Sequence, residues 1–201
     1  MPRTTKSSRR SYRLGRRAET SDETRQRLVE ATFQLHAERG IAETSMKDIA
    51  ERAAVSVGTV YHHFPSYAHA IVACGAYTAE HAPAPTAAIF AGAATREERV
   101  VRLVRALFDR YERVPALESV RRDRHLTREL DAFATEEARN RRKLAAEAVG
   151  ARGPVALAAA LADIDVYRAM RREGFSTADA ADRVAALLNL ELAGAPSAGR
   201  R

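Results

Sequence analysis

Cysteine, tryptophan and long apolar runs are scarce or missing in this chain of 201 residues. The single cysteine, Cys74, excludes an internal disulfide and a thiolate cluster for zinc. No run approaches the roughly 18 to 20 apolar residues of a membrane span. The basic N-terminus is not followed by the apolar segment of a secretory signal. We therefore expect a cytoplasmic protein that does not enter the membrane.

Helix-breaking residues are also few, with 10 glycines and 7 prolines. Strong helix formers such as Ala, Leu, Arg and Glu are abundant, which predicts an all-α chain. We find no G-x-S-x-G motif, no phosphate-cradling glycine loop and no H-E-x-x-H motif. The sequence therefore predicts no enzyme, no catalytic residue, and neither a metal nor a cofactor.

Positive charge is concentrated at the N-terminus. The net charge is +7, and residues 1–17 carry seven basic and no acidic side chains, so the remainder is balanced. We predict a disordered basic arm over residues 1–19, because a Ser/Thr/Arg-rich segment buries too little apolar surface to fold alone. Its Arg13, Arg16 and Arg17 are candidate contacts to DNA phosphates or the minor groove. A solvated tail and an arm on an anionic membrane are the alternatives.

Residues 20–65 have the outline of a helix-turn-helix domain. A capping box at Thr20 predicts the start of a first helix, and Gly40 predicts its end. Ser45 then predicts a helix over 46–52, and Ser56 one over 57–63 that stops before Pro65. Two short helices joined by a tight turn form a helix-turn-helix.

Residues 24–64 resemble the DNA-binding domain of the TetR family of bacterial regulators. The matching stretches are RQRLVEA (25–31), AERG (37–40), TSMKDIA (44–50) and AVSVGTVYHHF (54–64). The resemblance implies a dimeric transcriptional repressor at the bacterial nucleoid, released from a pseudo-palindromic double-stranded DNA operator by a small-molecule effector. The alternatives are an activator, a regulator without a ligand, and a non-specific architectural DNA-binding protein.

The candidate DNA contacts lie at the starts of the two short helices and just after them. A recognition helix reads base edges from its N-terminal residues, and a capped helix start suits a phosphate. A glycine inside this helix suggests close approach to DNA, or relief of crowding in the turn. The candidates are Thr44, Ser45, Lys47, Ser56, Val57, Gly58, Thr59, Tyr61, His62 and Tyr67.

Three positions depart from the family pattern. Ala54 replaces a usual glycine, which is acceptable if the backbone there is not left-handed. His36 replaces a large apolar residue, and we expect a core or boundary histidine there. Tyr67 replaces a lysine that often binds phosphate, so we expect the basic arm to supply the missing charge.

The remaining chain predicts a larger helical effector-binding and dimerisation domain over 66–194, followed by a frayed tail over 195–201. Helices are expected at 66–81, 96–112, 115–121, 125–149, 154–173 and 177–193. The resemblance implies that the last two long helices pair with a second copy; packing within one chain is the alternative.

Candidate effector contacts are aromatic and polar residues of the middle helices. Aromatic stripes of this kind are also typical of a plain core. An inward Arg121 or His125 would favour an anionic or phenolic effector. The candidates are Phe108, Tyr111, Arg121, His125, Phe133 and Tyr167.

Overall fold

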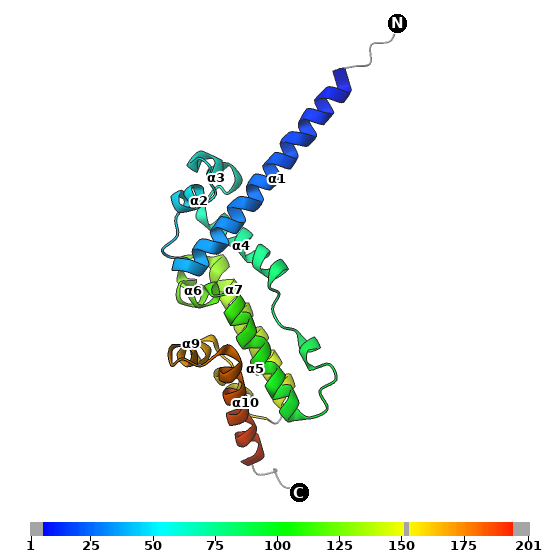
Figure 1. Cartoon of the computed structure of the whole chain (residues 1–201), viewed down its shortest axis with the longest axis vertical. Helices are drawn as coiled ribbons and strands as arrows, with labels where there is room; N and C mark the ends of the chain where they lie inside the picture. Colours follow the sequence, from blue (N-terminus) through cyan, green and yellow to red (C-terminus); the bar gives the residue numbers. More distant parts are fainter. Residues whose placement is uncertain (1–5, 151–152, 195–201) are drawn as a thin grey trace. The chain divides into compact units, whose positions relative to one another are not determined.

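The computed structural model of the chain describes residues 6–150 and 153–194, with side chains described from residue 20 onward. Helices joined by short turns make up this part of the chain, and it contains no strand, which confirms the all-α prediction. The chain divides into two compact units, Met1–Tyr77 and Thr78–Arg201 (Figure 1). No helix among the described residues combines the length and the apolar character that crossing a bilayer requires.

The first unit is built around a helix-turn-helix. Its helices are α1 (Lys6–Arg39), α2 (Met46–Arg52), α3 (Val57–His63) and the first part of α4 (Tyr67–His81). Gly40 ends α1 as predicted, with a φ of 93° and a backbone N–H that donates to the His36 carbonyl at 3.1 Å. The centre of the core is fully buried and consists of Leu28, Leu35, Ile49, Val60 and Phe64.

The start of α1 differs from the prediction. The helix begins at Lys6, so Thr20 lies inside it rather than at its cap, and the predicted boundary at residue 19 has no counterpart. Thr20 offers its carbonyl to the Thr24 hydroxyl at 2.7 Å, a bond between successive helical turns. Arginine is a good helix former, and nothing in the local sequence forces a break.

The boundary between the units also lies later than the predicted residue 65. Ala70 and Ala73 of α4 are buried in the helix-turn-helix core, and Tyr77 packs against that core with its ring centroid 5.5 Å from that of Phe33. The first part of α4 therefore completes the first unit instead of opening the second one.

The second unit is a bundle in which α10 packs along α5, and α5 packs on α7. The amphipathic α5 contributes the largest share of the core, from Val100 to Tyr111. The elements are η1 (Ala87–Phe90), α5 (Arg96–Arg113), α6 (Ala116–Arg122), η2 (Arg124–Leu126), α7 (Arg128–Val149), α8 (Val155–Leu161), α9 (Ile164–Arg172) and α10 (Thr177–Gly194).

One helix that we predicted as continuous, over 154–173, is broken into α8 and α9. Asp163 caps α9, because its carboxylate accepts the backbone N–H of Asp165 at 3.0 Å. The same carboxylate pairs with Arg121 of α6 and with Arg141 of α7, the latter at 2.6 Å. These distant partners hold the carboxylate at the break, which local helix propensity alone does not predict.

Candidate DNA-binding surface and effector cavity

Each of the two short helices begins at a serine whose side chain caps it. Ser45 and Asp48 form the predicted capping box, in which the Ser45 backbone N–H donates to the Asp48 carboxylate at 2.8 Å. Ser56 caps α3 by accepting the Thr59 backbone N–H at 3.1 Å. Both short helices therefore begin and end at the predicted residues, because their stop and start signals are local.

Ala54 in this turn adopts a left-handed backbone with a φ of 53°. The condition that we set for tolerating alanine in place of glycine is therefore not met. A left-handed conformation costs an L-residue roughly 1–2 kcal/mol, because Cβ crowds the following carbonyl. The turn therefore places an alanine in a backbone conformation that favours glycine.

Helix α3 has one buried side and one side open to solvent. Val60 and Phe64 anchor it in the core, whereas Val57 and Tyr61 are 39% and 51% exposed. His62 is also exposed. Partial burial lowers the pKa of His63, and the neighbouring charges of His62 and Arg25 lower it further. Thr59 is half-buried, and its hydroxyl lies 2.8 Å from that of Ser56. The open side thus presents Val57, Gly58, Tyr61 and His62 together.

Gly58 is not required by the packing of its own chain. A Cβ built there would meet only the Ser56 hydroxyl oxygen, at 3.7 Å, which is ordinary van der Waals contact. Relief of crowding in the turn, one of our two explanations, is therefore wrong. Close approach of DNA, the other explanation, stays a prediction.

Two predicted DNA contacts are turned inward. Thr44 is buried, and its hydroxyl donates to the Gly40 carbonyl at 2.8 Å. The Tyr67 hydroxyl donates to the Ile41 carbonyl at 2.6 Å and lies 2.9 Å from His36 Nε2. Because the phenol has one proton, His36 donates to Tyr67, and the two departures from the family pattern form one internal contact. Neither geometry fits a phosphate contact.

The other candidate phosphate contacts remain on the surface. Ser45 and Lys47 are exposed at the start of α2. Two nearby arginines are already paired, Arg39 with Asp48 at 3.4 Å and Arg52 with Glu38 at 2.6 Å. The side chains of Arg13, Arg16 and Arg17 lie outside the described part of the chain.

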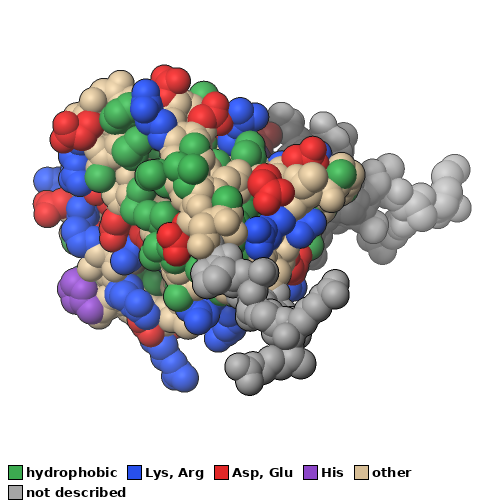
Figure 2. All heavy atoms as spheres, turned by 90° about the horizontal axis from the view of Figure 1, so that it is seen from below, with side chains coloured by type: hydrophobic (Ala, Val, Ile, Leu, Met, Phe, Trp, Pro, Cys, Tyr) green, Lys and Arg blue, Asp and Glu red, His purple; other side chains and the backbone are tan. Residues whose placement is uncertain are grey.

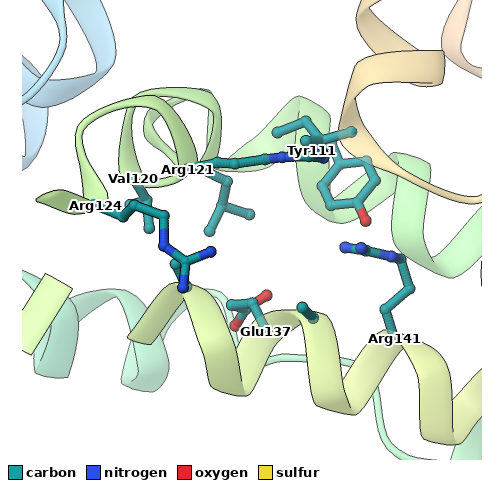
Figure 3. Close-up of a pocket in the computed structure, with 10 residues that line it drawn as sticks. Tyr111, Val120, Arg121, Arg124, Glu137 and Arg141 are labelled. Atoms are coloured by element: carbon teal, nitrogen blue, oxygen red, sulfur yellow. The ribbon is translucent and has the colours of Figure 1, made fainter. Parts of the chain in front are cut away.

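The second unit contains a cavity of about 170 Å³ between α6 and α7. Figure 3 shows Tyr111, Arg121 and Arg141 at one side of it and Arg124 and Glu137 at the other. Burial raises the pKa of Tyr111 to about 12, so its hydroxyl is protonated and donates to the Ala162 carbonyl at 3.2 Å. The apolar part of the wall consists of Leu117, Val120, Ala134, Ala138 and Ile164.

Only part of the predicted effector set lines this cavity. Tyr111 and Arg121 do. Phe108 and Tyr167 are buried, and their rings pack against each other and Tyr111 with centroids 5.1–6.2 Å apart, so they form the wall's support. Phe133 is half-buried and His125 is exposed on η2, and neither is among the lining residues.

Our sequence reasoning missed the contribution of α7. Ala134, Glu137, Ala138 and Arg141 all line the cavity. They recur at i, i+3, i+4 and i+7, which places them on one face of a helix. That spacing was visible in the sequence, but nothing in it distinguishes this face from a solvated one.

The first unit thus contains a helix-turn-helix with an exposed second helix, and the second unit holds a cavity lined by charged and apolar residues. Residues 28–68 match the model of the family described as bacterial regulatory proteins, tetR family. The HTH-type transcriptional repressor KstR of Mycolicibacterium smegmatis is 40% identical over 55 residues, 27% of each chain. The HTH-type transcriptional regulator TtgR of Pseudomonas putida is 40% identical over 58 residues, 29% of this chain and 28% of that protein.

These matches span only about a quarter of each curated relative. Solved structures extend the likeness of fold. A TetR-family regulator from Rhodococcus sp. superposes with a TM-score of 0.63 at 22% identity, covering 85% of this chain and 99% of that one. The ketosteroid transcriptional regulator KstR2 of Mycobacterium tuberculosis gives 0.61 at 21%, covering 85% and 93%. Residues 28–68 are therefore similar to the DNA-binding part of tetR-family regulatory proteins, and the solved structures extend the likeness of fold over most of the chain.

Proposed function

We propose that this chain is a transcriptional repressor that binds a pseudo-palindromic DNA operator through α3 and leaves it when an effector fills the cavity of the second unit. The observation that carries the proposal is the open side of α3, where an otherwise unexplained Gly58 lies among exposed side chains. Its place of action is the bacterial cytoplasm, on nucleoid DNA.

The exposed side of α3 suits base reading rather than charge attraction. Val57 can contact a thymine methyl group, and Tyr61 and His62 can donate to acceptors at the groove edge. The helix contains no Lys or Arg. Attraction to the phosphates therefore falls to Lys47 and the basic arm, since most of the affinity of DNA-binding proteins comes from neutralised phosphates.

A second copy of the chain is the partner that the second unit fits. Leu187 and Leu190 of α10 are 58% and 70% exposed, and Leu157 of α8 is 38% exposed. Figure 2, which shows the chain from below, has hydrophobic side chains in the middle of the view and charged ones around them. Because α8 is short, the proposed dimer surface consists of α8 and α10, not of two long helices. A two-fold dimer would place two α3 helices about one DNA turn, roughly 34–36 Å, apart.

Selection from a random duplex DNA pool tests the reading function. We expect the native chain to recover a pseudo-palindrome. Tyr61→Ala should relax the preference at particular bases, whereas Lys47→Ala should weaken binding to all sequences alike. Val72→Ala is the matched control, because Val72 is also 51% exposed but lies on α4. Recovery of no motif, with salt-sensitive binding to every sequence, would favour the architectural alternative.

Mass measurement in solution tests the dimer. Leu190→Glu should shift the chain toward the monomer, since a charge would be buried in the proposed interface. Leu126→Glu, at another leucine that is 45% exposed, should leave the dimer intact. A native chain that is monomeric at micromolar concentration contradicts the proposal.

A reporter gene under the recovered operator tests the sign of regulation. We expect the native chain to lower transcription, in line with the relative named as a repressor. Raised transcription would instead support the activator.

A further inference from the structure

The charged groups around the cavity of the second unit are unequal in number. Three guanidinium groups line it, those of Arg121, Arg124 and Arg141, against the single carboxylate of Glu137. Figure 3 shows these four side chains around the same space, with the Arg141 guanidinium facing the Tyr111 hydroxyl. The lining itself is therefore positive.

Glu137 is already committed to a buried partner. Its carboxylate lies 2.8 Å from Arg110 Nη2, and the Arg110 side chain is only 2% exposed. A cationic ligand that drew Glu137 away would leave a buried guanidinium without its counterion, which is strongly unfavourable. The one acidic group of the lining is thus a poor anchor for a cation.

Arg124 has an acidic partner of its own, Asp131, at 2.6 Å, whereas Arg121 and Arg141 share one. Asp163 lies outside the lining and serves both Arg121 and Arg141. Arg121 also meets Asp165 at 3.1 Å, but Asp165 is 67% exposed, so this pair contributes little. Each guanidinium has five N–H donors in a planar fork that matches a carboxylate. Because Arg121 and Arg141 share the Asp163 carboxylate, their guanidinium groups have N–H donors left for a second carboxylate.

The size of the cavity limits the ligand. At about 170 Å³ it is close to the roughly 150 Å³ of an engineered protein cavity that accommodates benzene. Leu117, Val120 and Ile164 supply an apolar wall that suits a hydrocarbon body. A large multi-ring ligand would have to extend beyond this cavity, toward a second hollow that shares Arg121, Ala138 and Arg141 with it.

We propose that this cavity binds a small organic monoanion, a carboxylate carried on a single ring, with the carboxylate held between Arg121 and Arg141 and the ring against the apolar wall. This ligand would be the effector of the proposed function, and its role in regulation depends on that function. Binding itself requires no DNA. The incoming carboxylate joins Asp163 as a second partner of both guanidinium groups, so the cap that Asp163 forms on α9 is the contact nearest to the bound carboxylate.

Three probes of one shape and different charge test the ligand class: benzoate, benzamide and benzamidine. Calorimetric titration of the full chain without DNA should show binding by benzoate, with benzamide weaker by roughly tenfold or more, because it lacks the charge-assisted hydrogen bonds. Benzamidine should bind least. Equal binding of benzoate and benzamide, stronger binding of benzamidine, or no binding of benzoate at millimolar concentration would each overturn the proposal.

Arginine variants locate the carboxylate. Arg121→Gln and Arg141→Gln should each weaken benzoate by roughly tenfold and leave benzamide almost unchanged. Arg139→Gln is the matched control, since Arg139 is also on α7 but is 71% exposed and pairs with Glu136. Arg121 is half-exposed, so its variant keeps the test open if Arg141→Gln fails to fold. Undiminished benzoate binding in folded Arg121→Gln refutes the assignment. Failure of DNA selection would leave these titrations unaffected, so the two proposals fail separately.

Discussion

Replacing Gly58 by alanine should make the chain more stable and its DNA binding weaker. Alanine is favoured over glycine inside a helix by roughly 1 kcal/mol. Gly58 has no positive φ, and the added methyl would make only one ordinary contact, at 3.7 Å from the Ser56 hydroxyl oxygen. Nothing within the chain opposes the gain, which corresponds to a rise in melting temperature of about 2–4 °C for a protein of this size.

DNA binding should change in the opposite direction. If the backbone of α3 approaches DNA where Gly58 lies, a methyl group there must be accommodated at a cost of roughly 1–3 kcal/mol. That cost corresponds to an affinity about 5 to 150 times lower. The assays are thermal unfolding followed by circular dichroism, and fluorescence anisotropy of a labelled operator at constant salt.

Gly75→Ala is the matched control for this substitution. Gly75 lies in α4 of the same unit, and a Cβ there would meet nothing within 4 Å. It should raise stability by a similar amount and leave operator affinity unchanged. Unchanged affinity in Gly58→Ala as well would refute the inference that DNA approaches this residue, and lowered stability would refute the packing argument.

Three further predictions concern the same unit. Ala54→Gly should raise the free energy of unfolding by about 1 kcal/mol, because it removes the left-handed strain at a φ of 53°; urea unfolding checks this, and a loss of stability contradicts it. Tyr67→Phe should lower that free energy by about 1–3 kcal/mol, since the Ile41 carbonyl and His36 lose a partner, yet the salt dependence of operator binding should stay the same; a shallower dependence would return Tyr67 to the DNA surface. Deleting residues 1–17 should reduce the slope of log K against log salt by roughly 0.9 for each DNA phosphate that the arm neutralises, and an identical slope would remove the arm from binding.

Local signals in the sequence predicted the helix-turn-helix well. The bounds of α2 and α3 match the predicted 46–52 and 57–63, because Ser45 and Ser56 act on backbone groups only three residues away. Leu28, Ala31 and Leu35, which recur at i, i+3 and i+7, likewise form the buried stripe of α1. Interactions confined to a few residues can be worked out from the order of the residues alone.

The start of α1 shows where local reasoning overreached. A capping box at Thr20 allows a helix to start there but does not force it to. The helix continues through Thr20 because the preceding residues also favour a helix. In the second unit, His125 and Phe133 were chosen for their chemistry, but their exposure depends on how η2 and α7 pack.

What the sequence determined by itself was the all-helical class, the two short helices with their caps, and the identity of the residues on the open side of α3. The tertiary structure decided the direction of Tyr67, the break at Asp163 and the gathering of Arg121, Arg124 and Arg141 around one cavity. Each of these depends on partners that are 20 or more residues away or on another helix. Side-chain orientation follows from which hydrogen-bonding and charged groups the fold brings within reach, and spacing along the chain does not contain that information.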